Sequence, residues 1–123
     1  MVLWHQMPAG APRATHWDFM IEVGSALRTW ALAEEPSDGE TIDAAALPDH
    51  RLAYLEYEGP VSGDRGEVSQ WDRGVCRAVE VTPDRCLYEL TGDRLVGQVL
   101  LVRAQPTDHW TFRFSSGRLA TPE

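Results

Sequence analysis

The stretch that decides the fold is His16-Trp17-Asp18-Phe19-Met20-Ile21-Glu22-Val23. Its side chains alternate between two faces with a period of two, which predicts a β-strand. The apolar face carries Trp17, Phe19, Ile21 and Val23. The opposite face carries His16, Asp18, Met20 and Glu22. An imidazole and a carboxylate two positions apart on one strand face suit a shared divalent cation, and an ordinary solvated polar face is the alternative interpretation.

The rest of the chain also favours short strands joined by tight turns. Gly24-Ser25 indicates a two-residue hairpin that brings Phe19 opposite Trp30. A helical turn capped by Thr41 is expected at residues 41–47. The expected strands are residues 2–5, 16–23, 26–32, 52–57, 66–71, 75–81, 86–90, 95–103 and 110–114. This pattern predicts an all-β fold, a compact small antiparallel β-barrel with at most one short helix.

Length and composition limit the class of protein. A chain of 123 residues is expected to form a single domain over residues 1–123 with one core. The net charge of −8 argues against a protein that coats nucleic acid, although one phosphate can still be held locally. Cys76 and Cys86 match no zinc pattern and are expected to be free thiols in a reducing compartment. Without a leader or a long apolar run, we expect a soluble, cytoplasmic protein with no membrane contact.

Three of the four histidines lie near the ends of expected strands. They are His5, His16 and His50, and His16 is accompanied by Asp18. This grouping favours a metal site at one mouth of the barrel. His109 has no such companion and is assigned to the surface.

The signature stretch belongs to a longer ordered pattern. Residues 16–22 resemble the His-Tyr-Asp-Phe-Arg-Leu-Glu motif of the 3′-phosphoesterase domain of bacterial DNA ligase D. In the same order, further segments resemble that family at Asp49-His50, Tyr57-Glu58-Gly59, Trp71-Asp72-Arg73-Gly74, residues 90–97 and residues 110–114. The resemblance runs from about His5 to Phe114, and it identifies the chain as similar to a standalone, short-form member of this family.

The resemblance implies a metal-dependent phosphoesterase of DNA repair by non-homologous end joining. Such an enzyme removes a 3′-phosphate or a terminal 3′-ribonucleoside from a DNA end. The expected cofactor is a divalent metal, manganese in the first place, with zinc or cobalt as alternatives. The expected partners are DNA 3′ ends at a primer-template or nick, and a separate DNA ligase or polymerase.

The family's site residues carry over to this sequence position by position. The metal ligands implied are His5, His16 and Asp18, and the loop between the two histidines is longer here. The family's third active-site histidine falls on His50 and its phosphate-contacting tyrosine on Tyr54. With Asp18, these two residues form the implied catalytic set. On an extended strand, His50 and Tyr54 would share a face.

Two departures remove positive charge from the expected phosphate position. The signature arginine is Met20 here, and a lysine of the family is replaced by Glu34. Arg51 and Arg65 are the candidates to bind the phosphate in its place, because a guanidinium fork matches phosphate oxygens. On the His16 strand face, Glu22 is a candidate to orient a metal ligand by hydrogen bonding.

Two other functions fit part of the same evidence. His16, Asp18 and His50 have the composition of the facial triad of non-haem iron oxygenases, which also occurs on β frameworks. Alternatively, a binding module retains the metal and phosphate pocket without turnover and recruits a ligase or polymerase to a DNA end. Metal content distinguishes the oxygenase from the phosphoesterase, and turnover distinguishes the binding module from the enzyme.

Overall fold

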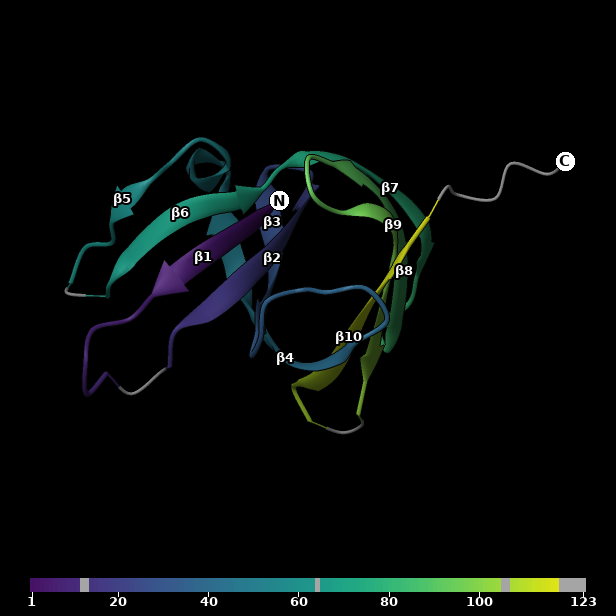
Figure 1. Ribbon diagram of the computed structural model, residues 1–123, viewed down its shortest axis with the longest axis horizontal. Helices are drawn as coiled ribbons and strands as arrows, with labels where there is room; N and C mark the ends of the chain where they lie inside the picture. The colour runs from purple at the N-terminus through teal and green to yellow at the C-terminus, as the bar shows by residue number, and fades with distance from the viewer. Residues whose placement is uncertain (12–13, 64, 105–106, 118–123) are drawn as a thin grey trace, which may run out of the picture.

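The computed structural model describes residues 1–11, 14–63, 65–104 and 107–117 (Figure 1). In this part of the chain, strands of one antiparallel sheet provide almost all regular structure, with a single short 3-10 helix, η1. The elements are β1 (Val2–Gln6), β2 (His16–Val23), β3 (Ala26–Leu32), β4 (Thr41–Arg51), η1 (Leu52–Leu55), β5 (Gly59–Pro60), β6 (Glu67–Asp72), β7 (Gly74–Val81), β8 (Arg85–Gly92), β9 (Val96–Arg103) and β10 (His109–Ser116). The described residues contain no helix long and apolar enough to cross a membrane.

The sheet is strongly curved, but it is not closed into the expected barrel. Its strand order is β5-β6-β1-β2-β3-β4-β10-β9-β8-β7, and its two edge strands do not pair with each other. Figure 1 shows β5, β6 and β1 on one side of β2 and β3, with β7 to β10 curling around on the other side. A barrel requires pairing between its first and last strands. The all-β prediction is confirmed, and the closed barrel is wrong.

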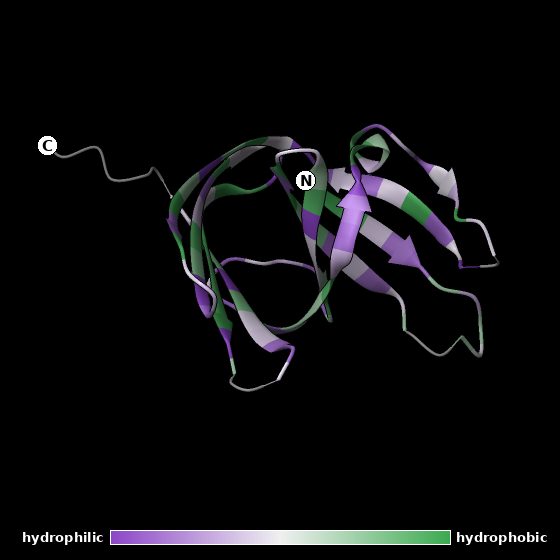
Figure 2. Cartoon of the chain, turned by 180° about the vertical axis from the view of Figure 1, so that it is seen from behind, coloured by the Kyte–Doolittle hydropathy of each residue, from purple (hydrophilic) through white to green (hydrophobic). Residues whose placement is uncertain are grey.

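The curved sheet buries two apolar clusters, one on each face of β2. The large core contains Phe19, Trp30 and Phe112, and the Phe19 and Phe112 rings pack edge to face at 5.2 Å. The expected pairing of Phe19 with Trp30 is confirmed, with ring centroids 6.1 Å apart. The small core consists of Leu3, Met20, Leu27, Val61 and Val68. Figure 2 shows the resulting alternation of hydrophobic and hydrophilic segments along the strands.

The region from Thr41 to Tyr57 differs from its prediction. Residues 41–47 are not helical, because β4 pairs there with β3 and β10 and so satisfies its backbone within the sheet. Between Leu47 and His50 the register with β3 shifts, so that Pro48 and Asp49 stand opposite a single residue. A proline lacks the N–H that a regular ladder needs, and a bulge accommodates it. After this bulge the chain turns into η1, which replaces the strand expected at 52–57.

The structure also shows where the cysteines and tryptophans lie. Cys76 is half-buried in β7, Cys86 is buried in β8, and both are free thiols, as expected. Trp30 and Trp110 lie in the large core, while Trp17 and Trp71 pack against it, so these indoles contribute to packing.

Asp72, at the end of β6, holds the turn between β8 and β9. Its buried carboxylate accepts hydrogen bonds from the backbone N–H groups of Asp93, Arg94 and Leu95, at 2.7, 3.0 and 2.9 Å. Gly92 makes room for this carboxylate, because a Cβ there would lie 2.5 Å from Asp72 Oδ2. Asp72 therefore connects two segments of the sheet that are distant in strand order.

We predict that Asp72→Ala lowers the free energy of unfolding by about 2–4 kcal/mol, because three backbone N–H groups lose a charged acceptor. Denaturant unfolding measures this change. The matched control is Asp93→Ala, an exposed aspartate in the same turn, which is expected to change stability by no more than about 0.5 kcal/mol. Equal stabilities of the two variants would contradict this role of Asp72.

Candidate metal centre

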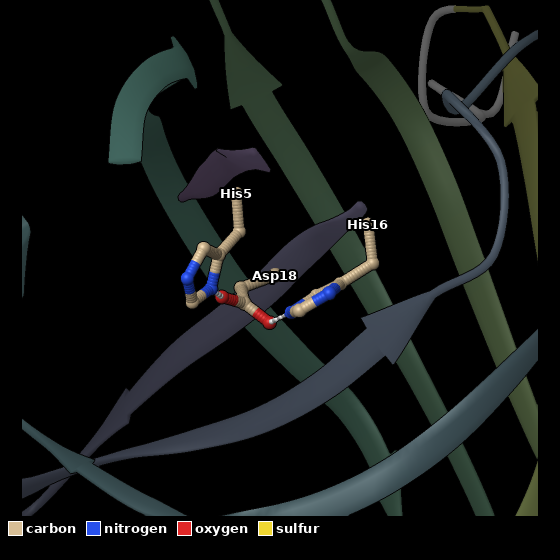
Figure 3. A group of neighbouring side chains, drawn as sticks. All are labelled: His5, His16 and Asp18. Atoms are coloured by element: carbon tan, nitrogen blue, oxygen red, sulfur yellow. Dashed lines mark hydrogen bonds and ion pairs between the residues drawn. The ribbon is translucent and has the colours of Figure 1, made fainter. Parts of the chain in front are cut away.

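The pairing of β1 with β2 brings two histidines and an aspartate together. His5, near the end of β1, is the register partner of His16, the first residue of β2. Asp18 follows on the same face of β2, and its carboxylate lies between the two rings (Figure 3). One ligand atom from each residue lies within 4.8 Å of the other two. Two imidazoles and a carboxylate form a donor set typical of divalent transition metals.

Backbone carbonyls determine which ring nitrogens carry protons. His16 Nδ1 lies 2.8 Å from the carbonyl oxygen of Ala14, and His5 Nε2 lies 2.6 Å from that of Arg65. A carbonyl only accepts, so each of these nitrogens donates its proton. In the neutral rings, the other nitrogens then present lone pairs to Asp18. Carbonyls that orient the rings in this way are common behind metal-bound histidines.

The contact between His16 and Asp18 is incomplete without a cation. His16 Nε2 and Asp18 Oδ1 lie 3.0 Å apart, close enough for an ion pair. Both atoms are nonetheless buried without a well-aligned hydrogen bond. The short distance alone satisfies neither atom, because two facing lone pairs attract only through a proton or a shared metal. The orphaned pair therefore fits a metal ligated by both residues.

Asp18 is held ionised in this position. Burial raises the pKa of Asp18, but the two neighbouring imidazoles of His16 and His5 outweigh this effect and lower the pKa to about 2. The carboxylate is 2% exposed and reaches His5 Nδ1 at 3.3 Å through its other oxygen. A metal ligand must be deprotonated at neutral pH, and Asp18 meets that condition.

A cavity of about 1000 Å³ opens beside the cluster. Seven residues that the sequence analysis named contribute to its lining, from elements far apart in the chain. They are His5, His16, Asp18, His50, Arg51, Tyr54 and Arg65. The cavity thus joins the candidate metal ligands to every candidate phosphate-binding residue.

Glu22, the remaining candidate, lies elsewhere. It is exposed near the far end of β2 and does not line the cavity. It lies six positions along the strand from His16, about 20 Å at 3.3 Å per residue. The structure therefore gives Glu22 no contact through which to orient a metal ligand.

His50 and Tyr54 meet by a different route from the one expected. They do not share a strand face, because His50 ends the bulged part of β4 and Tyr54 lies in η1. Their rings nevertheless pack edge to face at 5.5 Å. His50 Nδ1 donates to the carbonyl of Pro48 at 3.0 Å, so Nε2 is the nitrogen left for the cavity. His50 stands outside the metal cluster, whose second histidine is His5.

The cations of the cavity are arginines at positions other than the signature one. Met20 is 1% exposed within the small core, where a guanidinium would lose its hydration. Glu34 is exposed and does not line the cavity. Arg51 and Arg65 do line it, and within the described residues no ion pair engages either one. Arg65 donates from Nε to Ser62 O at 2.6 Å and from Nη2 to Ser62 Oγ at 3.1 Å.

Some contributors to the site were missed by sequence reasoning. The carbonyls of Ala14 and Arg65 orient the histidine rings, and residues 7–11 form part of the cavity wall. The position of a backbone carbonyl cannot be read from the pattern of side chains. Residues 7–11 belong to a loop, and a loop has no periodic pattern that would predict its place in the cavity wall. Pro48 within a strand was the available signal for the bulge.

Comparison with known proteins assigns most of the chain to one family. Residues 8–103 match the model of the DNA ligase D 3′-phosphoesterase domain. The multifunctional non-homologous end joining DNA repair protein LigD of Mycobacterium tuberculosis is 30% identical over 107 residues, covering 80% of this chain and 14% of that protein. The LigD protein of Pseudomonas aeruginosa is 28% identical over 98 residues, covering 72% of this chain and 12% of its own length.

The match contains six of the seven named cavity residues. His5 precedes it, so the place of His5 in the cluster rests on the geometry of β1 and β2. The chain spans about a seventh of the relatives' length. The extent of the family match, together with the identity to its relatives, shows that this chain belongs to the DNA ligase D 3′-phosphoesterase domain family.

Proposed function

We propose that this protein is a divalent-metal-dependent phosphoesterase that trims DNA 3′ ends in non-homologous end joining. Its substrates are a terminal 3′-phosphate and a terminal 3′-ribonucleoside, and its metal is manganese, with zinc or cobalt as substitutes. The observation that carries the proposal is the orphaned pair of His16 Nε2 and Asp18 Oδ1 beside a cavity lined by arginines. The family to which the chain belongs supports the same chemistry.

The metal-ligating residues and the phosphate-binding residues lie in different parts of the cavity lining. His5, His16 and Asp18 would hold the ion, which when bound neutralises phosphate charge and lowers the pKa of a coordinated water. Arg51 and Arg65 offer N–H donors to the remaining phosphate oxygens. The net charge of −8 supports binding at an end, where a few cations suffice, over binding along a duplex.

His50 and Tyr54 are suited to the leaving-group side of the reaction. His50 Nδ1 donates a hydrogen bond to the carbonyl of Pro48, which leaves Nε2 to face the substrate. Nε2 can protonate the departing oxygen. The Tyr54 hydroxyl can donate a hydrogen bond to a phosphate oxygen. The edge-to-face contact between the two rings holds them in a common orientation.

The first prediction concerns metal content. Wild-type protein reconstituted with Mn²⁺ or Zn²⁺ should retain a single divalent ion, and His16→Ala should lose it, because the orphaned nitrogen is removed. Elemental analysis after desalting measures the stoichiometry. His109→Ala, an exposed histidine paired with Asp43 at 3.5 Å, is the control and should bind as wild type does. Equal stoichiometry in all three proteins would remove the site from His16.

The second prediction concerns turnover. With Mn²⁺, the protein should release inorganic phosphate from a primer-template that carries a 3′-phosphate. Asp18→Ala should lower kcat/KM by more than about 100-fold, since even the loss of a hydrogen-bond partner of a metal ligand costs about 10–100-fold. Glu22→Ala, on the same strand but outside the cavity, should leave the rate unchanged. No release above the Asp18→Ala background would contradict the enzyme and favour the binding module.

The third prediction concerns the arginines. Arg51→Ala and Arg65→Ala should each lower kcat/KM by about 10- to 150-fold, the effect of about 1.5–3 kcal/mol for a charge-assisted hydrogen bond in the transition state. Metal content should stay unchanged, because neither side chain is a ligand. Arg113→Ala, an exposed position on β10, serves as control. If neither variant slows the reaction, neither Arg51 nor Arg65 serves the phosphate.

A further inference from the structure

A second, smaller cavity adjoins the first. It measures about 240 Å³ and shares the side chains of Arg51, Tyr54 and Val61 with the larger cavity. Tyr57 lines the small cavity and not the large one. The two cavities therefore lie side by side along a shared wall of Arg51, Tyr54 and Val61.

The wall of the small cavity is aromatic. Tyr54 packs on His50 at 5.5 Å and on Tyr57 at 5.9 Å, the latter with an interplanar angle of 87°. The Tyr57 hydroxyl donates to the carbonyl of Pro60, which fixes the orientation of its ring. Perpendicular rings offer a flat guest one face for stacking and one edge for a T-shaped contact. Three rings in a row thus lead from the catalytic side of the large cavity into the small one.

The size of the small cavity limits what it can bind. Sites for drug-sized ligands occupy about 300–1,000 Å³, so about 240 Å³ suits a single heterocycle. Arg51 borders both cavities and supplies a cation that can stack on a base or pair with a phosphate. The lining thus combines aromatic faces with a single guanidinium, which matches the chemistry of one nucleotide.

We propose that the small cavity binds the nucleobase of the terminal nucleotide, with Tyr57 as the residue that determines this specificity. This inference rests on the proposed function, which assigns the 3′-phosphate to the large cavity. Base–aromatic stacking tolerates every base, because each one has a π face. The protein therefore recognises a single nucleotide unit by its phosphate and its stacked base.

The test compares two substrates that differ only in the terminal base. Both are primer-templates that carry the 3′-phosphate on an unpaired terminal nucleotide, which is thymidine in one and an abasic deoxyribose in the other. Wild-type protein with Mn²⁺ should prefer the thymidine end by about tenfold in kcat/KM, a stabilisation within the range of one base–aromatic stack. Tyr57→Leu should lower kcat/KM for the thymidine end to the abasic level and leave the abasic rate unchanged.

Tyr57→Phe is the matched control, because it retains the ring and loses only the hydroxyl that bonds Pro60. It should keep most of the preference, and all three proteins should retain the same metal content. A uniform loss on both substrates in Tyr57→Leu would overturn the subsite, because it would indicate a general structural effect. A wild-type protein without preference between the two ends would overturn it as well.

The subsite and the phosphoesterase proposal can fail separately. If the wild type hydrolyses neither substrate, the proposed activity fails, and calorimetric binding of thymidine 3′-phosphate and deoxyribose 3-phosphate then tests the subsite alone. Tighter binding of the nucleotide, lost in Tyr57→Leu and kept in Tyr57→Phe, supports the subsite. Equal affinity for the two ligands overturns it.

Discussion

The site depends on one buried carboxylate between two imidazoles. Asp18 is 2% exposed, and its two oxygens face His16 and His5. An ionised group at such depth is costly unless hydrogen bonds or a cation compensate it. The compensation exists because β1 and β2 pair in a register that places His5 opposite His16. A shift of that pairing by one residue would turn His5 to the opposite face and leave Asp18 with His16 as its only imidazole neighbour.

The open sheet builds a cavity that a small closed barrel would fill with side chains. Both faces of β2 are covered, so the His16 and Asp18 face continues into the small core while the opposite face packs the large core. The bulge at Pro48 and Asp49 ends regular pairing where the chain reaches the cavity. Bulges re-aim side chains next to functional sites, and here the strand passes directly into η1 with Tyr54.

This member of the family carries the positive charge of its cavity at positions other than the signature position. The signature position belongs to Met20 and lies within an apolar cluster, while Arg51 and Arg65 line the cavity from other segments. A phosphate needs neutralising charge at its oxygens, and different backbone positions can supply it if their guanidinium groups reach the same point. Arg65 also orients one candidate metal ligand, because its carbonyl accepts the proton of His5 Nε2.

The sequence by itself determined the all-β class, most of the strands and the residues of the cluster. Alternation with a period of two and turn residues are local signals, and they predicted β2, β3 and the pairing of Phe19 with Trp30. Only the tertiary structure decided that the sheet stays open, that residues 41–47 join a strand between two neighbours, and that His50 meets Tyr54 across a 3-10 turn. These features depend on hydrogen bonds and packing between segments distant in sequence, which local periodicity does not encode.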